Sequence, residues 1–254
     1  MCNKINITPK LTIEGEDRTL GAVLLGAPYS RKRESVMLPM IQQDIQSKPM
    51  MGVAVFDTDG IPTQAAARCA RESGRPYVLL DPRMEWCPFF NPLIGDENEV
   101  FEDLRTVVSE YLPDLSPSLR ALNESLLSNA IKVLKRLDKA EGVNGRYATF
   151  INMNTVLQNP SQDGRKLVIR FGQLKGETDA EQKENSDIAS WFINEYYAER
   201  SKPFEQTACL RLLLGKLISE PHLRTVLNPD FDKGQVSEVD FDRLVSDNLS
   251  LIHI

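Results

Sequence analysis

Gly26 and Lys32 stand at the two ends of the stretch "GAPYSRK" (26–32), between an apolar run and a helical pattern. A glycine and a lysine at this spacing, after a strand and before a helix, are typical of loops that bind nucleotide phosphates. In such a loop, backbone N–H groups surround the phosphates, the lysine contacts the β- and γ-phosphates, and the next hydroxyl holds magnesium. A solvated basic turn at a helix start is the leading interpretation of this stretch, and a site for nucleotide phosphates is the alternative.

Other chemistries have little support in this sequence. The chain contains four cysteines and two histidines, which are Cys2, Cys69, Cys87, Cys209, His222 and His253. The cysteines are too far apart for a C-x-x-C metal pattern, and two histidines offer little to a zinc site or a Ser-His-Asp triad. The formal net charge of −6 argues against holding nucleic acid by bulk electrostatics. Apolar runs are too short to span a membrane, and no signal peptide is apparent, so we expect a cytoplasmic chain.

The first third of the chain alternates between apolar runs and amphipathic stretches. The apolar runs are 20–26, 51–57 and 76–82, and the helical patterns between them are 33–46 and 61–74. Strands that are apolar on both faces and alternate with helices indicate a parallel sheet covered on both sides. The pattern predicts the α/β fold class.

A mostly helical region follows the proline-containing loop 87–99. Apolar residues recur at spacings of three and four in the stretches 99–112, 116–137, 186–200 and 208–219. Ser116 before Pro117 makes a suitable helix cap. The closing stretch "NLSLIHI" (248–254) looks like a strand that returns to the sheet.

Three short motifs, in order, resemble the conjugative coupling proteins of type IV secretion, the TraG/TraD type. They are "GAPYSRKR" (26–33), "DTDG" (57–60) and "FNPL" (90–93). The resemblance implies a P-loop NTPase-like (RecA-like) parallel sheet with an inserted all-helical domain. It further implies a motor ATPase that uses ATP and Mg, acts on DNA with relaxosome or secretion-channel proteins, and forms a hexamer at the cytoplasmic face of the membrane.

Carried over onto this sequence, the family pattern makes five residues candidates for cofactor binding. They are Gly26, Ala27, Ser30, Lys32 and Asp57. The resemblance assigns no catalytic residue and no metal ligand to this chain.

The chain departs from the family pattern at the positions that matter most for hydrolysis. Tyr29 and Arg31 replace two loop glycines, and Pro28 has no N–H to offer. Arg33 replaces the hydroxyl that holds magnesium, and Asp59 replaces the lysine of the second motif. We therefore expect impaired nucleotide hydrolysis.

The resemblance also predicts how the chain divides. Residues 1–98 would be the first part of the nucleotide-binding domain, 99–222 the inserted all-α domain, and 223–254 a truncated return to the first domain. The family's second acidic motif would lie beyond residue 254, and this chain alone is not expected to form the hexamer. A non-catalytic protein-interaction module and an unrelated P-loop-like kinase are the alternatives.

Overall fold

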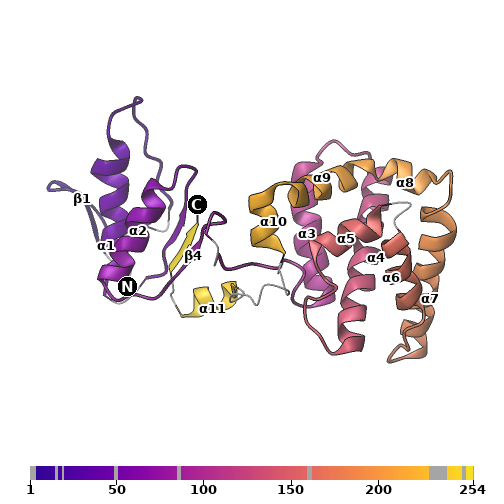
Figure 1. Cartoon of the computed structure of the whole chain (residues 1–254). Helices are drawn as coiled ribbons and strands as arrows, with labels where there is room; N and C mark the ends of the chain where they lie inside the picture. The colour runs from indigo at the N-terminus through magenta and orange to yellow at the C-terminus, as the bar shows by residue number, and fades with distance from the viewer. Residues whose placement is uncertain are drawn as a thin grey trace. The chain divides into compact units, whose positions relative to one another are not determined.

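The computed structural model describes residues 4–14, 17–18, 20–48, 51–84, 87–158, 162–228, 239–247 and 250–253. Cys2, at the N-terminus, lies outside these residues. The chain forms two compact units (Figure 1). The first, called here the N-terminal unit, is Met1–Pro88 together with Val236–Ile254, and the second, the helical unit, is Phe89–Gln235. In sequence, the helical unit therefore interrupts the N-terminal unit.

The N-terminal unit is built from short strands and a few helices. Its elements are β1 (Ile5–Thr8), β2 (Leu11–Ile13), a π turn (Arg33–Met37), α1 (Leu38–Ile45), β3 (Ala54–Phe56), α2 (Ile61–Glu72), β4 (Tyr77–Leu80), α11 (Phe241–Ser246) and β5 (Ser250–His253). β1 and β2 form an antiparallel hairpin. β5 lies between β3 and β4 and pairs with each in the parallel direction over three or four residues.

The core of this unit is small because its helices present small side chains. Ile45 of α1, Val55 of β3 and the α2 residues Ala66, Ala67 and Ala70 are buried together. The Arg75 guanidinium donates to the carbonyl oxygens of Asp44 and Ile45, at 3.1 and 2.8 Å, and so satisfies groups that the end of α1 leaves open.

The expected α/β fold class with a RecA-like parallel sheet is wrong for this chain, which is 60% helix and only 7% strand. The apolar run 20–26, predicted to be the strand before the phosphate loop, has no regular structure. Its side chains are open to solvent, with Leu20 79%, Val23 84% and Leu25 87% exposed. The two other runs yield only β3 and β4. An apolar run becomes a buried strand only if other strands and helices cover it, and the exposed run 20–26 is not covered.

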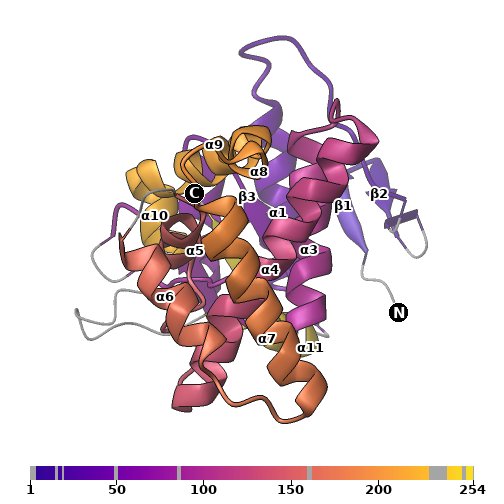
Figure 2. The ribbon, with the colours of Figure 1, turned by 90° about the vertical axis from the view of Figure 1, so that its right-hand side faces the viewer.

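The helical unit contains α3 to α10. Their bounds are α3 Glu97–Tyr111, α4 Pro117–Glu141, α5 Phe150–Leu157, α6 Gln162–Gly172, α7 Asp179–Trp191, a π turn Phe192–Tyr196, α8 Lys202–Gln206, α9 Ala208–Ser219 and α10 Pro221–Leu227. α3, α4, α6 and α7 run roughly side by side (Figures 1 and 2). Ser116 caps α4 as predicted, since its Oγ accepts from the N–H of Leu119 at 3.4 Å.

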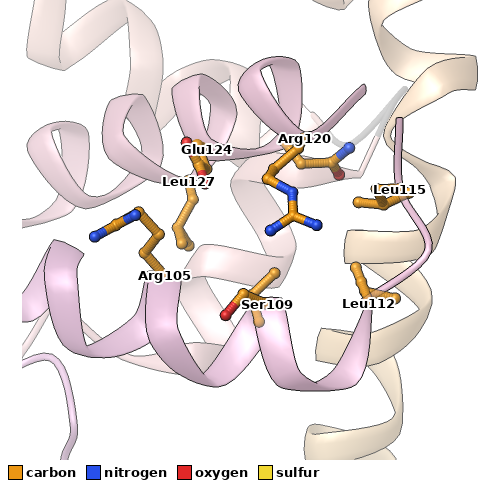
Figure 3. Close-up of a pocket in the computed structure, with 9 residues that line it drawn as sticks. Arg105, Ser109, Leu112, Leu115, Arg120, Glu124 and Leu127 are labelled. Atoms are coloured by element: carbon orange, nitrogen blue, oxygen red, sulfur yellow. The ribbon is translucent and has the colours of Figure 1, made fainter. Parts of the chain in front are cut away.

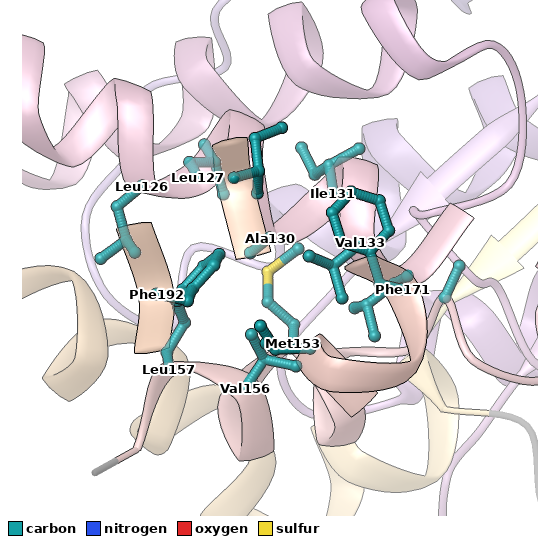
Figure 4. Packing of buried hydrophobic residues seen from close by; sticks show 14 of the residues in the cluster. Leu126, Leu127, Ala130, Ile131, Val133, Met153, Val156, Leu157, Phe171 and Phe192 are labelled. Carbon is teal, nitrogen blue, oxygen red and sulfur yellow. The ribbon is translucent and has the colours of Figure 1, made fainter. Parts of the chain in front are cut away.

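The core of the helical unit is organised around α4. Buried residues recur along this helix from Leu126 to Leu137. Met153 and Val156 of α5, Phe171 of α6 and Phe192 after α7 pack into the same cluster (Figure 4), and each of them is fully buried. Because this cluster closes within one continuous stretch of chain, the helical unit has its own hydrophobic core.

Gly164 of α6 is required by close packing. A Cβ at this position would overlap the carbonyl oxygen of Thr155 in α5, whereas a Cβ at Gly215 of α9 would meet nothing within 4 Å. Alanine normally stabilises a helix interior by about 1 kcal/mol relative to glycine. We therefore expect Gly164→Ala to lower the free energy of unfolding and Gly215→Ala to raise it by up to about 1 kcal/mol. Urea denaturation of both variants measures this, and stabilisation by Gly164→Ala would contradict the α5–α6 contact.

Candidate functional site

The backbone of the loop 26–33 has an unusual conformation at two positions. The N–H of Ser30 donates to the carbonyl of Ala27 at 3.2 Å, which closes a turn over Pro28 and Tyr29. Tyr29 and Arg31 have φ values of 65° and 55° and are the non-glycine residues described with positive φ. This conformation costs a residue with a Cβ about 1–2 kcal/mol. These are the two positions where the coupling-protein pattern has glycine.

The Lys32 side chain folds back over the start of the loop. Its Nζ donates to the carbonyl oxygens of Gly26 and Ala27, at 3.1 and 3.3 Å. A Cβ on Gly26 would lie 2.7 Å from Ser30 Oγ, so the loop passes very close to this glycine. Hydrogen bonds of this kind at the surface contribute about 1 kcal/mol each, and a phosphate could therefore replace the two carbonyls at small cost.

Arg33 joins the loop to the second motif. Its Nη1 lies 2.6 Å from Asp59 Oδ2, and the two side chains are 36% and 42% exposed. Such an exposed pair contributes at most about 1 kcal/mol. The pair nevertheless puts a guanidinium at the position of the family's magnesium-binding hydroxyl.

Asp57 caps the start of α2. Its Oδ1 accepts from the N–H of Asp59 at 2.8 Å and of Gly60, and its Oδ2 accepts from the N–H and the hydroxyl of Thr63 at 2.9 and 2.6 Å. Partial burial acts to raise the pKa of Asp57, but the hydrogen bonds from Thr63, Gly60 and Asp59 outweigh it and lower this pKa below its ordinary value.

The structure brings four of the predicted cofactor-binding residues together in one loop: Gly26, Ala27, Ser30 and Lys32. Among the described residues, Asp57 is linked to them through Asp59, whose N–H it accepts and whose carboxylate pairs with Arg33. Their binding role stays a prediction. The Arg33–Asp59 pair was not predicted from the sequence. A signal for it was present, since residues of opposite charge replace the family's residues in the two motifs.

The oxygen donors near this loop do not fit a magnesium ion. Both oxygens of Asp57 are committed to N–H and O–H donors, and those of Asp59 bond Arg33 and the N–H of Ile61. Within the part of the chain that the structure describes, no cluster of three or more His, Cys, Asp or Glu could hold a metal ion. Of the helices described, none is both long and apolar enough to cross a membrane.

No protein-family model, curated protein or solved structure matches this chain. The resemblance to coupling proteins therefore rests on three short motifs and their order.

Backbone strain in the loop leads to a stability prediction. Replacing Tyr29 with glycine removes the Cβ clash, and it loses little packing because this side chain is 99% exposed. We expect Tyr29→Gly to raise the free energy of unfolding by about 0.5–1 kcal/mol, after allowing for the added freedom of the unfolded chain. Tyr29→Ala, which keeps a Cβ, is the control and should give no gain. Equal effects of the two variants in chemical denaturation would rule out the strain.

The capping carboxylate leads to a pH prediction. Because the pKa of Asp57 is lower in the folded state, its stabilising charge is fully present above the ordinary value of 3.8 and is lost as the pH falls through the folded-state value. Asp57→Asn keeps an acceptor but loses the charge. We expect the wild type to be more stable than this variant by about 0.3–1 kcal/mol at pH 7, the contribution of a negative charge at a helix N-terminus. The difference should shrink in acid, and a constant difference from pH 7 to pH 2 would show that the charge contributes nothing.

Proposed function

We propose that this chain is part of a type IV secretion coupling protein and that its loop 26–33 binds the phosphates of ATP weakly, without efficient hydrolysis. One observation carries the proposal, the left-handed backbone at Tyr29 and Arg31. A strained conformation kept at both positions where the family has glycine is expected of a loop that must curve around a ligand. At Tyr29 the turn from Ala27 to Ser30 by itself calls for positive φ, because Pro28 and Tyr29 are its second and third residues. Arg31 lies outside that turn, so its left-handed backbone is the stronger support.

The charges of the loop support the same ligand. Arg31, Lys32 and Arg33 are consecutive cations, and within the described part of the chain the hydrogen bonds of Lys32 Nζ go to neutral carbonyl groups. A phosphate oxygen forms a stronger, charge-assisted hydrogen bond with an ammonium group than a carbonyl oxygen does. Binding would therefore exchange two weak contacts of Lys32 for stronger ones.

The same residues argue against efficient phosphoryl transfer. That reaction needs a magnesium ion held between the β- and γ-phosphates. Arg33 offers no oxygen ligand, and the carboxylate oxygens of Asp57 are already engaged. The expected activity is retention of nucleotide with little dependence on magnesium.

In this proposal the wider roles follow the family. The chain would act at the cytoplasmic face of the membrane, with DNA and relaxosome or secretion-channel proteins as partners, and would be monomeric or aggregate when isolated. A non-catalytic interaction module is the second candidate. It is favoured by the independent core of the helical unit, which leaves Val107 and Tyr111 of α3 exposed.

Calorimetric titration of ATP into the full chain tests the loop. We expect weak binding that is unchanged by magnesium and is reduced about tenfold or more by Lys32→Ala, since a charge-assisted hydrogen bond contributes about 1.5–3 kcal/mol. Lys48→Ala removes an exposed lysine elsewhere in the N-terminal unit and is the matched control.

A variant restored to the family pattern completes the test. Pro28→Thr, Tyr29→Gly, Arg31→Gly and Arg33→Thr together should give tighter, magnesium-dependent binding, because they supply N–H groups, relieve strain and return the hydroxyl. If neither the wild type nor this variant binds ATP, the loop is a solvated turn and the interaction module is the better proposal. Tight, magnesium-dependent binding of ATP by the wild type would also contradict the proposal that the loop 26–33 binds ATP weakly and without magnesium.

A further inference from the structure

The pocket between α3 and α4 of the helical unit has little room for a ligand (Figure 3). Its enclosed space is ≈ 10 Å³, about that of one water molecule. Asn123 lines this space, and its Oδ1 is buried and has no donor among the described residues. One water molecule would satisfy this acceptor. A larger partner therefore does not fit this pocket.

Exposed apolar side chains gather instead in the chain between β2 and α1. Five of the large hydrophobic residues that are exposed in the described chain lie between residues 20 and 29, and they are Leu20, Val23, Leu24, Leu25 and Tyr29. Their exposed fractions run from 43% for Leu24 to 99% for Tyr29, whereas the other exposed hydrophobic residues are scattered from residue 11 to residue 241. Single exposed apolar residues are normal, but a contiguous apolar patch marks a surface that contacts another molecule or a membrane.

The segment 20–33, called here the projecting segment, extends away from the rest of the N-terminal unit. Figures 1 and 2 show the chain before α1 as an open loop beyond the start of that helix. Every residue from 20 to 31 is exposed, and 21–26 has no regular structure. A large partner can therefore reach these apolar side chains without any rearrangement of the fold.

The projecting segment ends in three cations, Arg31, Lys32 and Arg33, and contains no acidic residue. Arg33 pairs with Asp59 at 2.6 Å, and Glu34, which follows directly, lowers the local positive charge. None of the ion pairs between described residues includes Arg31 or Lys32. Two cations beside the apolar run are therefore available to an anionic partner.

An apolar patch next to cations is complementary to the surface of an anionic bilayer, where negative head groups lie over an apolar interior. Free phosphate would occupy the cations and leave the apolar run 20–26 uncovered. A second copy of the run would cover the apolar side chains and leave the cations without an anionic partner. A membrane surface meets both requirements at once.

The net charge of −6 opposes the approach of the whole chain to such a surface. Charges farther away than about 8 Å are largely screened at physiological ionic strength, however, and a segment that projects brings its own cations closest to the lipid. The local charge of the segment therefore decides the contact.

The backbone of the run limits how deeply it enters the bilayer. Residues 21–26 form neither helix nor strand, and unpaired backbone groups cannot enter the hydrocarbon region. Side chains can still enter the boundary between head groups and acyl chains, where water hydrates the backbone. Tyr29 suits this boundary because its ring is apolar and its hydroxyl is polar.

We propose that the projecting segment binds the surface of an anionic lipid bilayer. Leu20, Val23 and Leu25 enter the boundary between head groups and acyl chains, while Arg31 and Lys32 contact lipid phosphates. The proposal does not depend on nucleotide binding by the loop 26–33, because the apolar run 20–26 takes no part in that binding.

Sedimentation of the full chain with lipid vesicles, at low protein concentration and without nucleotide, tests this contact. One set of vesicles contains phosphatidylcholine and phosphatidylserine in equal amounts, and the other contains phosphatidylcholine alone. We expect binding to the anionic set to be stronger by about tenfold or more, since two cations near the surface act together. Equal binding to both sets, binding to neither, or equal sedimentation without vesicles would overturn the proposal.

Inorganic phosphate distinguishes the lipid surface from free phosphate as the ligand. Added to the anionic vesicles, it should release no more protein than sodium chloride at the same ionic strength. Greater release by phosphate would show that the cations bind free phosphate, and the membrane contact would be wrong.

Two double variants separate the apolar contact from the charged one. Val23→Ser with Leu25→Ser should weaken binding to anionic vesicles at least tenfold, and Arg31→Gln with Lys32→Gln should abolish the preference for phosphatidylserine. Leu212→Ser, at a leucine of α9 that is 67% exposed, and Lys48→Gln are the matched controls and should change neither. If both double variants bind like the wild type, another surface contacts the vesicles and the assignment is wrong.

Discussion

Burial of one apolar stripe along α4 is the constraint on which the helical unit depends. The polar residues near the end of this helix tie the other elements to it. Arg136 bonds Glu97 of α3 at 3.1 Å and Glu184 of α7 at 2.8 Å. Asp138 accepts from the N–H groups of Gly145, Tyr147 and Ala148, and so fixes the turn that leads into α5. Polar substitutions of the buried α4 residues would therefore weaken the packing of the helices on both sides of α4.

Most of the long helices could be predicted from the sequence. The stretches 99–112, 116–137 and 208–219 correspond to α3, α4 and α9 within a few residues. Their periodic apolar residues and the Ser116 cap are local signals, and a helix completes its hydrogen bonds within its own segment. α5 and α6 were not expected, because both are short and the sequence analysis assigned no helix to their residues.

The strand predicted for 20–26 failed for the opposite reason, whereas β3, β4 and β5 form within the other predicted strands. The run 20–26 has the composition of a buried strand, but a strand needs a partner, and local composition does not specify one. The candidate site divides in the same way. The spacing of Gly26 and Lys32 was visible in the sequence, whereas the contact between Arg33 and Asp59 joins residues 26 positions apart and depends on tertiary structure. The hydrogen bonds that Asp57 accepts from the start of α2 could not be predicted either.

The exposed run 20–26 also affects how the molecule behaves in a crowded solution. Leu20, Val23 and Leu25 are exposed on a stretch without regular structure, and no residue of 20–26 carries a charge. Segments of this kind readily form strands with copies of themselves. Protein concentration, more than heat, would then set how long the isolated chain stays dispersed. A single charged side chain in place of Val23 would act as a gatekeeper against such self-association.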